Sequence, residues 1–241
     1  MPFEVLVFDG LGICPDSRTG LLRALYSILS PNYWIGAVDQ TQLRSGKWTH
    51  TCSLLALPHC SDVEVYSRLG QDSEAIEQIR EFVQSGGSFL GIGGGAFFAS
   101  AQANWVGRMV GPTALALWPG TSTGPCLRGG PHLHDLSLNI DNNRYQCYLF
   151  WEDGGEFERA PRTDVLARYN DEKSVAAIHH VSGEGNVVLW HARLECALGA
   201  QLVRGTCGMP NFSDEEIMVI YSLPINGLNT EICIGLRTMP P

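Results

Sequence analysis

Residues able to move protons or attack an electrophile follow the apolar run at 52–58, where His59, Cys60 and Asp62 come close together. An imidazole has an ordinary pKa near neutrality and a thiolate is a strong nucleophile, so a relocated histidine–cysteine pair is one hypothesis. Adjacent residues of an extended segment point in opposite directions, so direct pairing of His59 with Cys60 is not expected. We therefore expect His59 to serve as a general acid or base; the alternative is a hydrogen-bonded loop histidine.

Two further groups of polar residues have spacings that could support chemistry. Glu152 and Asp153 follow Trp151 in the turn sequence FWEDGG. Paired carboxylates can share a proton, although adjacent acids in a turn are more often solvated. His132 and His134 alternate, so both could face one side of a strand and bind a metal. Because no third ligand is identifiable, we expect neither a metal nor another cofactor.

The stretch GGSFLGIGGGAFFAS, residues 86–100, predicts a strand that turns sharply into a helix. Such a turn often carries a nucleophile, whose side chain projects over the edge of the sheet near free backbone N–H groups. Here Gly93 occupies the turn and Gly94 follows it, so no side chain can attack. The glycine spacing does not match a nucleotide-binding loop. We expect Gly93 and Gly94 to leave room for a ligand, with Phe97 as an apolar wall.

An alternation of apolar runs and amphipathic segments predicts the scaffold that must position these residues. Strands are expected at 4–8, 33–38, 52–58 and 88–92, and helices from Ser17 to about Ser30, from Asp72 or Ser73 to Ser85, and starting within 96–103. Strands that alternate with helices imply a parallel sheet with helices on both faces. Ligands bind at the carboxyl edge of such sheets, where His59, Cys60, Asp62 and Gly93 fall. We therefore expect Cys60 and Asp62 to contact a substrate there.

The second half of the chain has a different pattern. From residue 112 onward, short strand-like runs separated by turn sequences predict antiparallel strands added to the α/β core. The segment SDEE at 213–216 fits a capping box and predicts a helix to Ser222, followed by a strand at 230–236. We therefore expect one α/β domain at 1–205 and a C-terminal extension at 206–241 that packs on this domain or on a second copy.

Composition excludes some partners. The net charge of −9 argues against nucleic acid or anionic membrane as the main partner. The N-terminus lacks the basic segment of a signal peptide, and no apolar stretch approaches the ~20 residues of a membrane span. The eight cysteines include no C-x-x-C pair, so most are expected to be reduced and buried. We expect a cytoplasmic protein with a small-molecule substrate, and a homodimer is conceivable.

Several sequence motifs occur in a characteristic order, among them VLVFDGLG, LLALPHCSD, FVQSGGSFLGIGGGAFFAS, YLFWEDGGEF and the final RLE. In this order they resemble the class I glutamine amidotransferase-like family, specifically the N-terminal domain of fungal biotin–protein ligases and its stand-alone relatives. The resemblance covers roughly residues 3–203. It implies a flavodoxin-like α/β fold, and it places the FWEDGG turn near the entrance of the family's active site.

The same resemblance implies a degenerate catalytic triad. Gly93 stands where the family has its nucleophilic cysteine, and Arg193 stands where it has its histidine, whereas Glu195 matches the triad acid. A glycine cannot attack and an arginine stays protonated, so the family's thiol chemistry is not expected. His191, two residues before Arg193, could occupy nearly the same space as the missing histidine.

Three functions remain open. The first is an enzyme without covalent thiol catalysis, in which His59 or His191 moves protons and Arg193 or backbone N–H groups hold an oxyanion. Ring closure, isomerisation or dehydration of an apolar metabolite in fungal secondary metabolism would fit the family context. The second is a binding or scaffolding protein whose site is plugged by an Arg193–Glu195 ion pair. The third is an amidase that uses Cys60. An open cavity at Gly93 would favour the first, and a mutual Arg193–Glu195 hydrogen bond the second.

Overall fold

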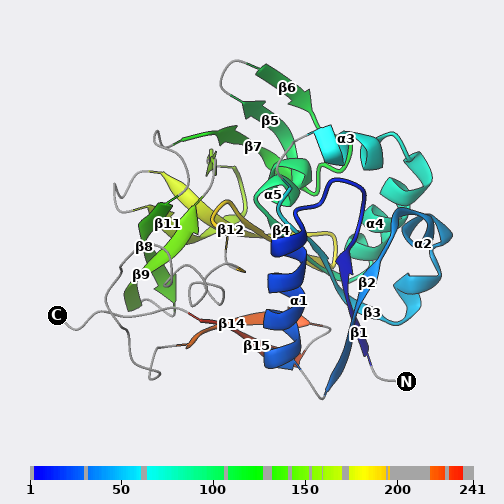
Figure 1. The fold of residues 1–241 in the computed structure, drawn as a ribbon, viewed down its shortest axis with the longest axis horizontal. Coiled ribbons are helices and arrows are strands. Elements are labelled where there is room, and N and C mark those ends of the chain that lie inside the picture. Colours follow the sequence, from blue (N-terminus) through cyan, green and yellow to red (C-terminus); the bar gives the residue numbers. More distant parts are fainter. Residues whose placement is uncertain are drawn as a thin grey trace.

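The chain is built on one large mixed sheet with helices on both faces (Figure 1). The structure, a computed structural model, describes residues 3–29, 32–60, 64–105, 108–126, 132–140, 143–151, 154–158, 160–169, 174–193, 195, 218–225 and 228–235. Within these residues, thirteen strands form the main sheet and two more form a separate hairpin. No helix in this part of the chain is long and apolar enough to cross a membrane.

The parallel half of the sheet carries the candidate site. Its strands lie in the order β2 (Tyr33–Val38), β1 (Phe3–Phe8), β3 (Cys52–Leu57), β4 (Ser88–Ile92) and β13 (Gly185–Trp190). All four neighbouring pairs are parallel. The apolar runs of β3 and β4 are buried at every residue, as expected for strands covered on both faces. The strands predicted at 33–38 and 88–92 are confirmed residue for residue.

Helices cover the two faces of this sheet. α1 (Pro15–Leu29) packs Leu21, Leu25 and Leu29 against Val5 and Leu54 on one face. The other face is covered by α2 (Gln40–Ser45), η1 (Lys47–His50), α3 (Glu64–Gly70) and α4 (Ser73–Gln84). The expected cap Ser17 lies inside α1 instead, because Pro15 occupies the first helical position, for which its fixed φ is suited.

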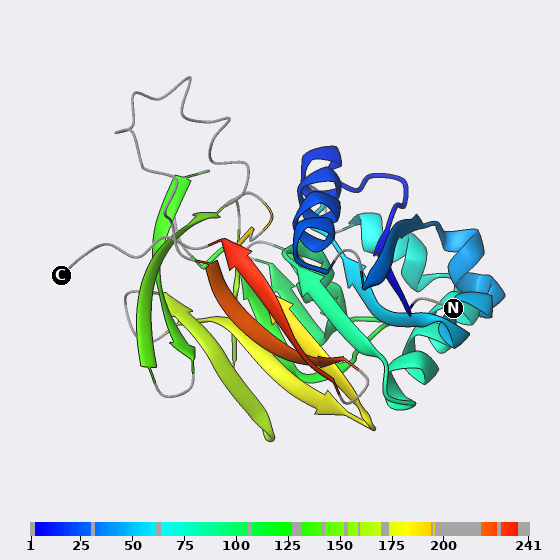
Figure 2. The same ribbon diagram turned by 90° about the horizontal axis from the view of Figure 1, so that it is seen from below.

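Antiparallel strands extend the sheet, as expected from residue 112 onward, and two further strands within 100–112, which were not expected, join them. They are β12 (Val175–Ser182), β10 (Glu156–Phe157), β7 (Trp118–Gly124), β5 (Ser100–Trp105) and β6 (Arg108–Pro112), with a branch of β11 (Thr163–Tyr169), β8 (His132–Ile140) and β9 (Asn143–Trp151). β5 and β7 are an exception, since they pair in parallel. Figure 2 shows β8 and β9 at the end of the molecule opposite the helices that follow β2.

The helix expected to start within 96–103 is shorter than its apolar pattern indicates. α5 (Gly94–Ala99) ends before Ser100, which begins strand β5. The hydroxyl of Ser100 donates to the carbonyl of Ala96 at 2.9 Å and lies 2.6 Å from the Ser122 hydroxyl on β7. Pairing with β7 therefore overrides the local helical pattern.

The expected helix through Ser222 is wrong where the structure describes it. Met218–Ile225 forms strand β14, which pairs antiparallel with β15 (Leu228–Gly235). The sequence MVIYS is rich in β-branched and aromatic residues, and cross-strand pairing to β15 outweighs the capping signal. The capping segment 213–216 lies outside the described residues, while the strand expected at 230–236 is confirmed by β15. β15 contacts α1 (Figure 1).

Candidate functional site

Gly93 forms the sharp turn between β4 and α5. Its backbone has φ 53° and ψ −112°, a combination open to glycine because it lacks a Cβ. Its N–H donates to the carbonyl of Trp190 at 2.7 Å, and its own carbonyl accepts from the N–H groups of Ala96 and Phe97, both at 3.0 Å. The predicted elbow is therefore present and firmly held, without a side chain at its tip.

His59 covers this elbow. A Cβ placed on Gly93 would overlap Nδ1 of the His59 ring. The ring is 8% exposed, and within the described residues its Nδ1 has no hydrogen-bond partner. Burial, together with the positive charge of Arg193, lowers the pKa of His59 to about 4, so the ring is neutral at pH 7. The space that a nucleophile's side chain would need is thus taken by an uncharged imidazole.

Arg193 and Glu195 form a buried ion pair beside the elbow. Nε of Arg193 donates to Oε1 of Glu195 at 3.1 Å, and the two residues are 5% and 2% exposed. Burial raises the pKa of the Glu195 carboxyl, and hydrogen bonding to Ser17 together with the Arg193 charge opposes this rise. Its Oε2 finds no partner among the residues that the structure describes.

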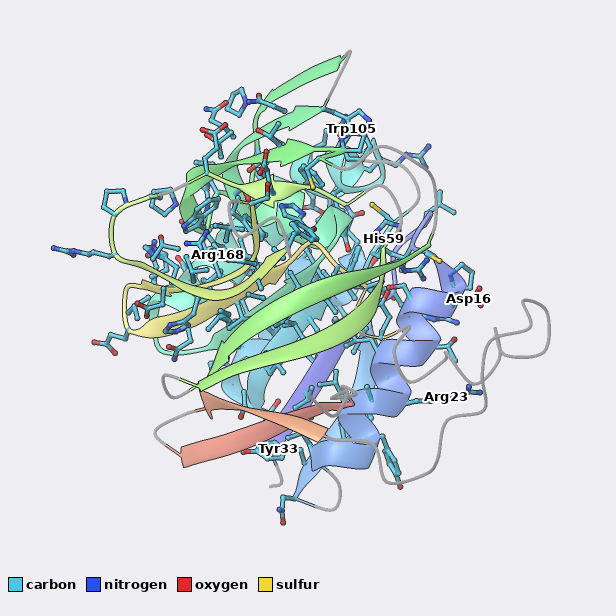
Figure 3. All side chains as sticks on the ribbon, turned by 90° about the vertical axis from the view of Figure 1, so that its left-hand side faces the viewer. Asp16, Arg23, Tyr33, His59, Trp105 and Arg168 are labelled. Atoms are coloured by element: carbon cyan, nitrogen blue, oxygen red, sulfur yellow. The ribbon has the colours of Figure 1, made fainter. Side chains whose placement is uncertain are left out.

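The start of α1 closes the same edge. The Ser17 hydroxyl accepts from the backbone N–H of His59 at 3.0 Å. A Cβ on Gly20, one turn further along, would come within 2.9 Å of the Glu195 carbonyl, so glycine permits close approach of the helix. Figure 3 shows His59 near this end of α1, where Asp16 is labelled. Ser17 was missed as a site residue because its apparent role was only that of a helix cap.

His191 precedes Arg193 by two residues, and its ring is enclosed by aromatic rings. It is 1% exposed, with ring centroids 4.0 Å from Phe157 and 4.5 Å from Phe97. Burial lowers its pKa to about 3. Its backbone N–H donates to Ala176 at 3.0 Å, whereas neither ring nitrogen has a partner in the described part of the chain. The Phe97 side chain therefore packs against His191.

Cys60 is turned away from His59, as the alternation of an extended segment predicts. It is 4% exposed, and a Cβ on Gly94 would overlap its sulfur.

The neighbouring loop contributes Cys14, whose sulfur accepts from Nη2 of Arg193 at 3.7 Å. Cys14 was not singled out from the sequence, since nothing in its neighbours signals that a buried arginine will reach it.

Other candidate residues fall elsewhere. Asp62, Glu152 and Asp153 lie outside the described residues, so their expected roles stay predictions. Trp151 ends β9 opposite His132 on β8, and only the backbone of these strands is described. The residues that the structure does bring together at the carboxyl edge are Cys14, Ser17, His59, Gly93, Arg193 and Glu195.

The fold of this chain is also that of solved amidotransferases. A crystal structure of a glutamine amidotransferase aligns with a TM-score of 0.61 at 15% identity, covering 83% of this chain and 97% of the other. A glutamine amidotransferase from Thermotoga maritima gives a TM-score of 0.52 at 14% identity, covering 85% and 82%. At such identities the likeness shows the fold alone, and it confirms the expected amidotransferase-like α/β sheet.

Sequence relatives narrow the family. The biotin–protein ligase of Schizosaccharomyces pombe (strain 972 / ATCC 24843) is 31% identical over an alignment of 210 residues, which covers 77% of this chain and 32% of the ligase. This chain therefore spans about a third of that ligase. An uncharacterized protein of Chlamydia muridarum (strain MoPn / Nigg) is 26% identical over an alignment of 183 residues, which covers 70% of each chain. Residues 3–210 match the family described as "Biotin-protein ligase, N terminal". This chain belongs to that family.

Proposed function

We propose that this chain is a non-hydrolytic binding domain, in which the amidotransferase-like active site has become a structural plug. The observation that carries the proposal is the Arg193–Glu195 hydrogen bond of 3.1 Å, buried where the family resemblance places the triad histidine and acid. His59 supports it, because its ring occupies the space in front of Gly93. The family's thiol chemistry needs a cysteine at the elbow and a histidine as its base, and this chain has Gly93 and Arg193 at those positions.

The two histidines near the elbow, His59 and His191, are also poorly suited to acid–base catalysis at neutral pH. With pKa values lowered to about 4 for His59 and about 3 for His191, both rings are uncharged at pH 7. Neither can then donate a proton as an imidazolium, and as bases they are far weaker than a group matched to neutral pH. The proposed role is therefore to bind a small molecule or a second copy of the chain, without turnover.

The ligase relative suggests the setting for this role. That relative is named a biotin–protein ligase, and this chain covers only 32% of the ligase's length. We propose that the domain is an accessory unit, separate from any ligation chemistry. The small-molecule ligand expected from the sequence, and the homodimer that the sequence left open, remain parts of this proposal.

The experiment is a hydrolysis assay on the full chain. Ammonia release from glutamine, and from a panel of simple amides, should stay at the rate without protein. A matched variant, His59→Gly with Gly93→Cys and Arg193→His, supplies the missing groups and tests whether the scaffold otherwise admits substrate. Turnover of glutamine or an amide by the unaltered chain would overturn the proposal.

A second candidate, a non-thiol enzyme acting on an apolar metabolite, is favoured by one specific observation. The His59 Nδ1 and both ring nitrogens of His191 are buried and lack partners among the described residues, and such atoms are usually satisfied in proteins. A ligand's polar groups could satisfy them, with Phe97 and Phe157 as apolar walls. Mass spectrometry of protein purified from its native host tests this candidate: a co-purified metabolite that is converted on incubation would establish it.

A further inference from the structure

Cys14 and His59 face each other across a short antiparallel bridge. The loop after β1 meets the loop after β3 at the bridge pair Ile13–Cys60. One residue further along, the N–H of Cys14 donates to the carbonyl of His59 at 3.3 Å. Side chains of residues opposed in such a bridge project to the same side. The thiol of Cys14 and the imidazole of His59 therefore lie on the side opposite to Ile13 and Cys60.

Arg193 approaches both members of this pair. Its Nη2 donates to the Cys14 sulfur at 3.7 Å, and its charge also acts on His59. Cys14 directly precedes Pro15, the first residue of the 15-residue helix α1, so its sulfur lies near the positive end of the helix dipole. A guanidinium and a helix N-terminus both stabilise negative charge on sulfur, which grows as a thiol ionises and attacks.

The residue that carries this thiol is also not fully buried. Cys14 is partly exposed, and nearby Leu11 is 79% exposed. In contrast, Cys52 and Cys60 are buried, and burial raises the pKa of Cys52 to about 12. Among the described residues, only Cys126 has a comparable partial exposure.

Unpartnered polar atoms point to a polar group that belongs at this edge. His59 is 8% exposed and directs its Nδ1 at the elbow, and Glu195 is 2% exposed with a free Oε2. Both residues are joined to Cys14 through Arg193 or the bridge, and neither atom has a hydrogen-bond partner in the described chain. A hydroxyl carried on the Cys14 sulfur would add a donor and an acceptor beside Arg193, which contacts both Cys14 and Glu195.

We propose that Cys14 is a modification site, a reactive thiol that hydrogen peroxide oxidises to a sulfenic acid. The thiol first loses its proton to solvent. The sulfur then attacks one peroxide oxygen: an S–O bond forms, the O–O bond breaks, and sulfur gives up two electrons. The departing hydroxide takes a proton and leaves as water. This modification goes beyond the binding role proposed above, since it can occur with or without a bound ligand.

The test compares two thiols in the same molecule. The full chain, folded and free of denaturant, is treated with hydrogen peroxide. Sulfenic acid is trapped with a 1,3-dicarbonyl reagent and located by peptide mass. Because Cys14 and Cys126 are both partly exposed, accessibility alone predicts similar rates. Activation by Arg193 and the helix predicts that Cys14 reacts at least about tenfold faster than Cys126. Equal rates, or a faster Cys126, would overturn the proposal.

A double variant tests the cause. Arg193→Met with Glu195→Gln removes the guanidinium without leaving a buried carboxylate unpaired. The Cys14 rate should fall toward that of Cys126, while the Cys126 rate itself stays constant as the internal control. An unchanged Cys14 rate in a variant with the native near-ultraviolet circular dichroism would show that Arg193 does not activate the thiol, which contradicts the proposal. The comparison within the unaltered chain holds even if the variant fails to fold.

Discussion

A glycine and a histidine share one small volume at the elbow. Gly93 has φ 53°, and a Cβ there would overlap His59 Nδ1. A substitution should therefore carry two costs, one from the backbone and one from the overlap. Gly86 isolates the backbone effect, because it also has a positive φ, 106°, but a Cβ placed there would meet nothing within 4 Å.

Gly93→Ala should lower the free energy of unfolding by more than Gly86→Ala, each strained backbone costing about 1–3 kcal/mol. His59→Ala should restore part of the loss at Gly93 and none at Gly86, since only the first site has the overlap. Urea unfolding of the three single and two double variants gives the coupling. If His59→Ala rescued both sites equally, the ring would not be what fills the elbow.

Removing one member of the Arg193–Glu195 pair should destabilise the fold strongly, whereas replacing both members by apolar residues should destabilise it little. Arg193→Met alone leaves a buried carboxylate, and the expected destabilisation is about 3–5 kcal/mol. Arg193→Met combined with Glu195→Leu removes both charges and should recover most of this loss. Thermal or urea unfolding checks it. A double variant as unstable as the single one would mean that the pair contributes more than mutual neutralisation.

Stability should fall as the pH drops below neutrality. His59 and His191 have folded pKa values of about 4 and about 3, below the ordinary 6.5, so the unfolded chain binds more protons between these limits. The stability due to each neutral ring is complete above pH 6.5 and declines by about 2 kcal/mol between pH 7 and 5. His191→Phe should reduce this decline in stability by the part that the His191 ring contributes. Urea unfolding at pH 7 and pH 5 measures the decline, and an unchanged decline in His191→Phe would contradict the prediction.

At the scale of elements, the sequence predicts strands well where a short apolar run lies between turn residues. The runs of β2 and β4 are bounded by turn residues and were placed correctly. The end of α5 depends instead on a contact with β7, 22 residues away, between Ser100 and Ser122. The 218–222 segment depends on pairing with β15. Neither partner is visible in a local pattern, and for the same reason the Arg193–Cys14 contact, 179 residues apart, could not be predicted.

The N-terminus of α4 offers a prediction at this scale. Asp72 caps the helix by accepting from Ala75 N–H at 3.2 Å and also binds Arg44 on α2 at 2.6 Å. Hydrogen bonding to Arg44 lowers the pKa of Asp72 to about 2. Asp72→Asn keeps a capping oxygen but loses the charge, whereas Asp72→Ala loses both. The alanine variant should unfold about 1 kcal/mol more easily than the asparagine variant. Equal midpoints would show that the cap contributes nothing.

At the scale of the whole molecule, the site depends on segments that are distant in the chain. The parallel half supplies Gly93 and His59, while Arg193 and Glu195 arrive only after the chain has built the antiparallel half and returned through β13. The amidotransferase-like sheet thus keeps its carboxyl edge intact although the residues on it have changed. Fold and chemistry are separable here, which is why the resemblance predicted the sheet correctly while its triad did not carry over.

The hairpin of β14 and β15 forms a sheet of its own, and β15 contacts α1. A two-stranded hairpin alone is marginally stable in water, so it needs an apolar surface from this chain or from a second copy. We predict that a chain ending at residue 205 keeps its far-ultraviolet circular dichroism and a cooperative unfolding transition. Light scattering then shows whether the hairpin packs on its own chain or on a second copy. If the hairpin packs on α1, the mass per particle falls only by the deleted segment; if it joins two copies, the particle mass falls by more than half. Loss of the cooperative transition would show that 206–241 is part of the core and that the expected domain boundary is wrong.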